Sequence, residues 1–215
     1  MPVRLTRRGV VRSASEAELA AAKEEFASLH SIVLRGFIAP DLLAVVQRQL
    51  ACQPFLHKTN AGIGTELRLP SGSLSSALEF LTNEPALFQA VEEVTGCRSI
   101  GCFRGRVYRM LPGAGHASDW HSDVSGGRMI TMSVNLSTSV FEGGELQIRE
   151  ATSERIIRRL RNTGAGDAVI FRIDPALQHQ VLPLTGNVHR DALAGWFLAS
   201  PDYRDLFRAY RSASA

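Results

Sequence analysis

The hydrophobic and polar positions divide the chain into a helical first part and a strand-rich second part. Residues 14–30 are rich in Ala and Glu and are typical of a helix, whereas the apolar run 31–34 predicts a short strand. A second helix is expected to begin at Pro40-Asp41 and to carry a stripe of Leu and Val on one side. Two further helices are predicted over 73–82 and 84–95.

The segment between the second and third predicted helices differs from its neighbours. Residues 57–70 are polar and contain Gly62 and Gly64, so we expect a mobile loop, and glycine-bearing polar loops of this kind often act as lids. Asn83 stands immediately before the fourth helix and is expected to cap its N-terminus.

From Arg98 onwards the pattern changes to short apolar runs separated by turn-forming residues such as Gly126-Gly127 and Gly143-Gly144. The predicted strands are 98–111, 129–137, 144–149, 154–160, 167–173, 178–183 and 191–199. Regular short strands indicate an antiparallel sandwich or barrel, which makes the chain mostly β. A last amphipathic piece, 202–210, predicts a closing helix.

One domain spanning 1–215 is expected, because this length supports a single sizeable core. Its parts would be an N-terminal helical layer over about 13–97, a β core over about 98–200, and a C-terminal helix or tail over 201–215.

The composition is that of an ordinary soluble protein, with 45% hydrophobic and 21% charged residues. The net charge of +3 does not favour a nucleic-acid partner, and the arginine-rich run 149–161 is interpreted as an exposed hairpin because it lacks interleaved aromatics. No apolar run approaches a membrane span, and the start of the chain lacks the apolar core of a signal peptide. Three cysteines without metal-like spacing fit a reducing compartment, so we expect a cytoplasmic protein, of open oligomeric state.

The candidate chemistry lies in the strand-rich part, at His121 and Asp123. In an extended segment residues i and i+2 point the same way, so both side chains would aim at one point. With His179 from a later strand they would form a set of two histidines and one carboxylate, which suits Fe(II) and leaves coordination sites open. The spacing alone also arises by chance. His116 lies in a glycine-rich turn and is an alternative to His121, and His189 remains a further histidine on the same late segment.

The neighbouring motifs resemble the 2-oxoglutarate/Fe(II)-dependent dioxygenases, and within them the prolyl-hydroxylase-like branch, over about 98–200. The motifs that carry the resemblance are, in chain order, Tyr108, His121-Ser122-Asp123, Asn135-Leu136, Gly143-Gly144-Glu145-Leu146, Gly166-Asp167-Ala168-Val169-Ile170-Phe171, His179, Gly186, Arg190 and Trp196-Phe197. The resemblance implies a double-stranded β-helix, a jelly-roll or cupin-like barrel, with the helical layer packed on it. It also implies that His121, Asp123 and His179 ligate the iron.

The resemblance further implies residues for the co-substrate 2-oxoglutarate. Arg190 would pair with its distal carboxylate, because a guanidinium matches a carboxylate with two parallel hydrogen bonds; the alternative is a surface ion pair. Tyr108 would hydrogen-bond the co-substrate, or else be a core aromatic. Asn135 replaces a tyrosine that relatives often have there; its side chain is shorter, so it would reach the co-substrate through a bridging water or not at all. Thr131 and Ser133 share its face, which suits a cofactor pocket or, alternatively, solvent.

The implied reaction uses O₂ and 2-oxoglutarate to hydroxylate an unactivated C–H bond of a small-molecule, amino-acid or peptidyl substrate, with release of succinate and CO₂. Arg106 and Trp196 are the candidate substrate-binding residues. Arg106 alternates with Tyr108, so it either faces the pocket and suits an acidic substrate or pairs with an acid at the barrel rim. Two other functions stay open: a cupin-like metal enzyme without oxidative chemistry, and a catalytically silent barrel used for binding.

Overall fold

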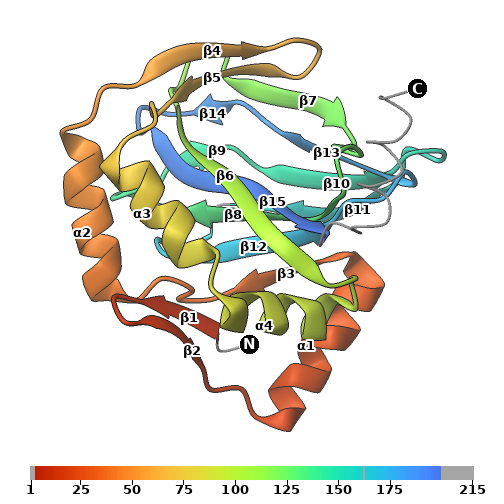
Figure 1. Cartoon of the computed structure of the whole chain (residues 1–215). Coiled ribbons are helices and arrows are strands. Elements are labelled where there is room, and N and C mark those ends of the chain that lie inside the picture. Colours follow the sequence, from red (N-terminus) through yellow and green to blue (C-terminus); the bar gives the residue numbers. More distant parts are fainter. Residues whose placement is uncertain (1–2, 162, 200–215) are drawn as a thin grey trace, which may run out of the picture.

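Four helices and a large antiparallel sheet make up the part of the chain that the computed structural model describes, residues 3–161 and 163–199 (Figure 1). The helices are α1 (Glu16–Leu29), α2 (Pro40–Ala51), α3 (Ser73–Thr82) and α4 (Pro85–Thr95). All four predicted helices are therefore confirmed. The predicted helix over 202–210 lies outside the described residues.

The ends of the helices follow from local sequence. Ser15 and Glu18 form a capping box that satisfies the first free N–H groups of α1. Pro40 and Pro85 occupy the first turn of α2 and α4, where a missing N–H costs nothing. Helix α4 ends at Gly96, whose left-handed backbone (φ 63°) suits glycine.

One 11-stranded sheet contains most of the strands in the described part of the chain, and all of its pairings are antiparallel. Its neighbours run in the order β11-β10-β13-β7-β5-β6-β15-β8-β12-β3, with β4 added beside β5. The strands are β3 (Ser31–Leu34), β4 (Leu56–Asn60), β5 (Gly64–Arg68), β6 (Ile100–Met110), β7 (Ala117–His121), β8 (Arg128–Asn135), β10 (Leu146–Glu150), β11 (Ile156–Leu160), β12 (Ala168–Arg172), β13 (Leu177–Val181) and β15 (Arg190–Ala199).

Two small two-stranded sheets contain the other strands of the described residues. They are β1 (Val3–Thr6) with β2 (Gly9–Arg12), and β9 (Glu142–Gly143) with β14 (Leu184–Thr185). The sequence pattern predicts no strand at these two pairs or at β7. All of these strands are short, and β9 lies in a turn cluster, so none of them shows the repeated alternation from which a strand is recognised.

The large sheet rolls up, so that its two ends face each other across a central space. Side chains from β7, β10 and β13 line the same cavity as side chains from β6, β8 and β15. Leu146 and Ile148 of β10 likewise form one apolar cluster with Val169 and Phe171 of β12. This is the predicted double-stranded β-helix, with all seven predicted strands present.

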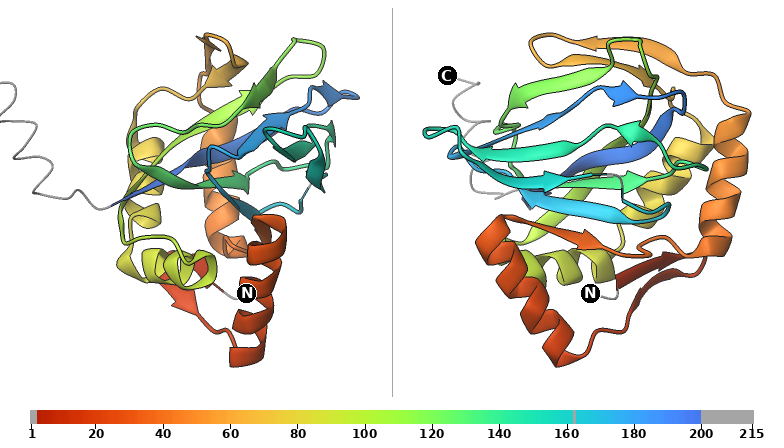
Figure 2. Two further views of the ribbon diagram at one scale, coloured as in Figure 1. Left: turned by 90° about the vertical axis from the view of Figure 1, so that its right-hand side faces the viewer. Right: turned by 180° about the vertical axis from the view of Figure 1, so that it is seen from behind.

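Strands β6, β15 and β8 separate this cavity from the helical layer. Their outward residues, such as Phe103, Phe197 and Ile130, are fully buried and join one core cluster with Leu87 and Val91 of α4. Burying a side chain of this size stabilises the fold by roughly 1.5–3 kcal/mol. Helices α3 and α4 thus hold the sheet from outside, along the side and bottom of the barrel in Figures 1 and 2.

The prediction of a mobile loop over 57–70 is wrong. Residues 56–68 form the hairpin β4–β5, and β5 also pairs with β6 and β7, so it joins the two halves of the sheet on the side of the molecule away from α1 (Figures 1 and 2). Its polar residues face the cavity or solvent, which is why the segment lacks the apolar alternation of a strand. The predicted role of Asn83 is also wrong. Asn83 ends α3 and does not cap α4, whose N-cap is Glu84.

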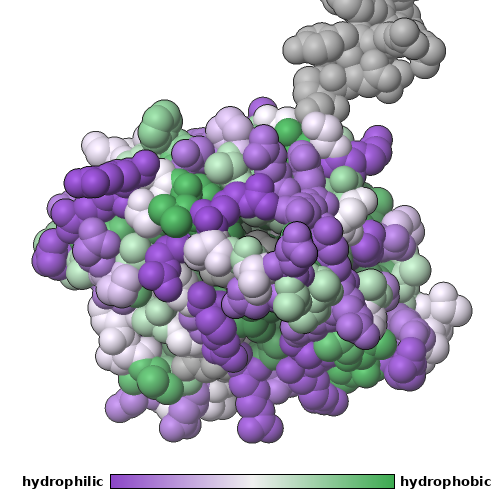
Figure 3. Space-filling model, turned by 90° about the horizontal axis from the view of Figure 1, so that it is seen from below, coloured by the Kyte–Doolittle hydropathy of each residue, from purple (hydrophilic) through white to green (hydrophobic). Residues whose placement is uncertain are grey.

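The arginine-rich run is the predicted hairpin, β10–β11, and its charges are paired. Arg155 pairs with Glu150, Arg158 with Glu25, and Arg159 and Arg161 both with Glu145. Seen from the side of α1 and β1–β2, the surface is mostly hydrophilic, with apolar residues in small separate groups (Figure 3). None of the helices in 3–161 and 163–199 is long and apolar enough to cross a membrane.

Candidate metal centre

The two histidines of the predicted triad lie on neighbouring strands. Strand β7 ends at His121, which stands directly opposite His179 of β13 in the antiparallel register. Directly opposed residues on one face of a sheet are close, and the two rings are 4.2 Å apart between centroids. Strand pairing therefore unites two histidines that lie far apart in the sequence.

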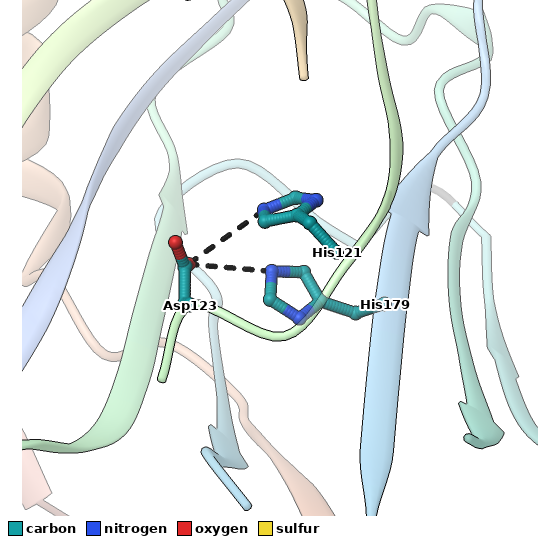
Figure 4. A group of neighbouring side chains, drawn as sticks. All are labelled: His121, Asp123 and His179. Atoms are coloured by element: carbon teal, nitrogen blue, oxygen red, sulfur yellow. Dashed lines mark ion pairs between the residues drawn. The ribbon is translucent and has the colours of Figure 1, made fainter. Parts of the chain in front are cut away.

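Asp123 reaches the histidines in a way that the sequence analysis did not anticipate. Its backbone is left-handed (φ 58°), so the chain bends after β7 instead of staying extended. The bend turns the carboxylate back, and its Oδ2 lies 3.7 Å from His121 Nε2 and 3.4 Å from His179 Nε2. The ligand atoms of the three residues all lie within 4.8 Å of one another, and Figure 4 shows both rings facing the carboxylate.

The ring of His121 is oriented by its own strand. Its Nδ1 lies 2.6 Å from the carbonyl oxygen of Asp119, an acceptor, so Nδ1 carries a proton and Nε2, the nitrogen on the side of Asp123, is the atom left to bind a metal. Burial lowers the pKa of His121, but its hydrogen bonds with Asp123 and the Asp119 carbonyl outweigh burial and leave the pKa raised. For His179 burial dominates, and its pKa is lowered.

The Asp123 carboxylate is anchored from the other side by two cavity residues. Trp196 donates its indole N–H to Oδ2 at 2.8 Å, and Arg128 donates to Oδ1 at 3.2 Å. The Arg128 guanidinium also stacks on the Trp196 ring, 3.7 Å from its centroid. Burial raises the pKa of Asp123, but the hydrogen bonds with both histidines and Trp196 outweigh it and hold the pKa well below its ordinary value. The carboxylate is thus ionised and ready to bind a cation.

These three residues open into a cavity of about 430 Å³, within the size range of small-molecule sites. Register sets its floor in rows across β6, β15 and β8. The rows are Arg104–Trp196–Thr131, Arg106–Ala194–Ser133 and Tyr108–Ala192–Asn135. Thr131 and Ser133 line the cavity, so the first two members of the predicted polar stripe do face inward.

Arg190 lies in the same cavity, buried, and has no acidic partner among the described residues. Its guanidinium donates only long hydrogen bonds of 3.3 Å, to the Gly144 carbonyl and the Ser133 hydroxyl. Its Nε has no partner, and neither has the buried hydroxyl of Thr131. A buried guanidinium costs free energy unless it is paired, so these atoms fit a bound anion such as the carboxylate of 2-oxoglutarate.

The two other candidate co-substrate residues, Tyr108 and Asn135, differ in their position relative to the cavity. Tyr108 is buried, lines the cavity, and lies between Arg106 and Arg190. Asn135 is buried and lies outside this cavity, but it lines a small neighbouring pocket together with Ser133 and Arg190. Its side-chain amide donates to the Thr163 carbonyl at 2.7 Å and accepts from the Ser137 N–H at 3.0 Å.

The two candidate substrate residues both line the cavity. Arg106 forms a bidentate ion pair with Glu66 of β5 (2.7 and 3.1 Å), and Trp196 has the role at Asp123 described above. Glu66, Arg68 and Arg128 were missed by the sequence analysis. The signal for Glu66 was concealed by the interpretation of its segment as a loop, since inward alternation has meaning only on a strand.

The competing histidines stand apart from the triad. Nδ1 of buried His116 accepts the Leu111 N–H at 3.0 Å, and its ring packs near His57. His189 lies 3.6 Å from Asp191. Neither belongs to the metal-ligand group that the described residues form.

Comparison with known proteins agrees with this geometry. The sequence model of the 2OG-Fe(II) oxygenase superfamily matches residues 105–198, which span Arg106 to Trp196 and include the triad and Arg190. The predicted resemblance to this superfamily is thereby confirmed over residues 105–198. The protein is accordingly an iron- and 2-oxoglutarate-dependent dioxygenase, an oxidoreductase. No curated protein matches the chain.

Solved 2OG-Fe(II) oxygenase structures share the fold. A Pseudomonas putida prolyl-4-hydroxylase is 19% identical, with a TM-score of 0.62 over 85% of this chain and 100% of its own. A 2OG-Fe(II) oxygenase family oxidoreductase from Burkholderia pseudomallei is 17% identical, with a TM-score of 0.63 over 91% and 95%. SnoN, a non-haem α-ketoglutarate-dependent epimerase of nogalamycin biosynthesis, is 14% identical, with a TM-score of 0.65 over 86% and 82%. At these identities the similarity establishes the fold.

Proposed function

We propose that this dioxygenase is a hydroxylase that acts on an unactivated C–H bond, with His121, Asp123 and His179 as its iron ligands. The observation that carries the proposal is a convergent triad that shares one cavity with a buried arginine lacking an acidic partner. Imidazole nitrogens and a carboxylate oxygen are the donor set that Fe(II) prefers, and three protein ligands leave coordination sites free.

Arg190 is proposed to bind the distal carboxylate of 2-oxoglutarate. Its unpartnered Nε and its weakly bonded terminal nitrogens provide the parallel donors that a carboxylate accepts. The Ser133 hydroxyl next to it can donate to the same group, and Tyr108 closes the cavity wall between Arg190 and Arg106. Asn135 stays a proposed co-substrate residue, because it lines a small pocket together with Ser133 and Arg190, where Thr163 and Ser137 hold its amide.

When bound, iron and 2-oxoglutarate supply the oxidising power of O₂ and leave succinate and CO₂ as by-products. The residues around the site orient the proposed iron ligands and shield them from water. Trp196 and Arg128 fix the carboxylate of Asp123, and the Asp119 carbonyl fixes the tautomer of His121. Phe171 packs edge-on against His179 at 4.7 Å between ring centroids, which keeps water from that side of the ligand.

The substrate is proposed to be a small molecule, an amino acid or a peptidyl residue, since the cavity has the volume of a small-molecule site. The similar structures include a prolyl-4-hydroxylase and an epimerase of nogalamycin biosynthesis, so the fold serves both peptidyl and small-molecule chemistry. One core domain and a cytoplasmic location remain part of the proposal; the three free cysteines support a reducing compartment.

The test begins without oxygen. Adding Fe(II) and 2-oxoglutarate should produce the visible charge-transfer band of the chelate. Admitting oxygen should then give slow release of succinate, even without substrate. Absence of both, with protein shown to be folded, would overturn the proposal. A band without succinate would favour a silent binding barrel, and iron binding without any band would favour a cupin-like non-oxidative enzyme.

Arg190→Ala separates the proposed roles within the site. The affinity for 2-oxoglutarate should fall about 100-fold or more, since a charged hydrogen-bonded pair is lost, while the affinity for iron should stay nearly unchanged. Equal weakening of iron and 2-oxoglutarate would show that Arg190 supports the fold of the site instead of binding the co-substrate.

A further inference from the structure

The end of the cavity away from Arg190 has its own arrangement of charge. Arg104 and Arg106 alternate on β6 and share its inward face, in register with Trp196 and Ala194 of β15. Trp196 stands six residues beyond Arg190 on the same strand, which corresponds to roughly 20 Å along the strand. A group bound there therefore occupies a region distinct from the Arg190 end.

Positive charge exceeds negative charge in this cavity. Five arginines line it against two carboxylates, those of Glu66 and Asp123. Arg128 is engaged with Asp123, and Arg190 is assigned to the co-substrate. Three arginines at the far end are left to share the single carboxylate of Glu66.

Glu66 is divided between two of these three arginines. Arg106 binds it in a bidentate pair, and Arg68 donates to its Oε1 at 2.7 Å from Nη2 and at 3.1 Å from Nε. The single negative charge of Glu66 thus balances only one of the two positive charges of Arg68 and Arg106. Burial of Glu66 keeps this shared pair out of bulk water, so the surplus charge is only partly screened.

Arg104 lines the cavity but is exposed to solvent, and it has neither an ion pair nor a side-chain hydrogen bond with any residue in 3–161 or 163–199, so its donors are free for a ligand. Ala194, which stands opposite Arg106 and next to Trp196 on the same face of β15, carries only a methyl group, so this part of the cavity floor is low. The Trp196 ring is flanked by two guanidinium groups, Arg128 at 3.7 Å and Arg106 at 5.5 Å. The far end is therefore a preformed cationic wall beside an open volume.

We propose that this wall binds an anionic group of the substrate, a carboxylate or a phosphoryl group, through Arg104 and Arg106. The inference rests on the proposed function, because the Arg190 end is reserved for the co-substrate. On binding, the substrate anion takes over donors of Arg106 and Arg104, while Glu66 stays paired with Arg68. Guanidinium groups suit this task because they hold carboxylate and phosphoryl oxygens with two parallel hydrogen bonds.

The experiment compares matched acidic and neutral probes on the full chain, loaded with Fe(II) and 2-oxoglutarate without oxygen. N-acetyl-glutamate methylamide is titrated against N-acetyl-glutamine methylamide, and the capped phosphoserine against capped serine, by calorimetry. In at least one pair the acidic probe should bind about tenfold more tightly, and the pair that discriminates tells carboxylate from phosphoryl recognition. Arg104→Gln should lower that affinity about tenfold, while Arg155→Gln, an exposed charge on β10–β11, should not change it.

Glu66→Gln gives a prediction of opposite sign. Removing the carboxylate that competes for Arg106 should tighten the acidic probe several-fold and leave the neutral one unchanged. The inference is overturned if neither acidic probe binds better than its neutral partner, or if Arg104→Gln acts no more than Arg155→Gln. Formation of the chelate band in the same samples shows that the proposed function stands in that case, whereas its absence is a failure of the proposed function itself.

Discussion

The indole N–H of Trp196 donates to Oδ2 of Asp123 at 2.8 Å, and this is the carboxylate oxygen that faces both histidines. Trp196 comes from β15, the last strand along the described chain, and Asp123 from a bend after β7, and two further strands, β5 and β6, separate β7 from β15 in the sheet. Since Asp123 has a left-handed backbone and no strand to hold it, this hydrogen bond and the one from Arg128 fix its carboxylate.

Trp196→Phe tests that relationship. It keeps an aromatic ring for Arg128 to stack on and removes only the donor. Iron affinity should fall about tenfold, the lower end of the usual effect of removing a residue that orients a metal ligand. Titration with Fe(II) without oxygen measures it. Trp120→Phe is the matched control, because Trp120 stacks on Arg149 and does not line the cavity. A similar loss in both variants would mean that Trp196 does not act through Asp123.

His179→Ala tests the identity of the third ligand. Stoichiometric iron binding should disappear, because the remaining His121 and Asp123 hold a metal with only two donors. His189→Ala should bind iron normally, since that side chain is partly exposed beside Asp191. Metal analysis after gel filtration gives the result, and circular dichroism checks the fold. Iron retained by the His179 variant would return the third ligand to His116 or His189.

The pH dependence of iron binding follows from the ionisation of the triad. A metal binds the deprotonated ligand, and the pKa of His121 is raised above its ordinary 6.5. The pKa values of Asp123 and His179 are lowered, so both are already deprotonated near neutral pH. Iron affinity should therefore be full above the raised pKa and fall about tenfold per pH unit below it, one proton being displaced. A flat affinity between pH 8 and 5.5 would contradict this account.

Local sequence signals predicted much of the fold. The helices have caps and prolines at their ends, and the strands of the barrel have apolar alternation, so both follow from short segments. The hairpin β4–β5 could not be predicted from its own sequence, because its strands lie beside the cavity and carry polar residues such as Glu66 and Lys58. Its conformation is decided by pairing with β6 and β7, which is a tertiary interaction.

The site divides in the same way. Residue type and order predicted His121, Asp123, His179 and Arg190, which the structure gathers around one cavity. The hydrogen bonds that orient these residues could not be predicted. The contact between Trp196 and Asp123, for example, depends on the left-handed backbone of Asp123, for which the sequence has no recognisable signal. The co-substrate contact proposed for Asn135 stays a prediction: its amide bonds to the Thr163 carbonyl, and the residue lines a small pocket beside Arg190.

Asn83 is predicted to stabilise the fold without touching the site. Its side chain donates to the Phe103 carbonyl at 2.9 Å and accepts the Phe103 N–H at 2.8 Å, which ties α3 to the outer edge of β6. Asn83→Ala leaves both backbone groups unpaired and should lower the free energy of unfolding by about 2 kcal/mol.

Urea unfolding measures the effect of Asn83→Ala, with Asn187→Ala in an exposed turn as the control, expected within about 0.5 kcal/mol of the unaltered chain. Iron affinity should be unchanged in both variants, because Phe103 belongs to the outer face of β6, turned away from the cavity. A stable Asn83 variant would mean that water replaces the side chain on β6. Weakened iron binding would mean that the position of β6, set by α3, controls the geometry of the metal centre.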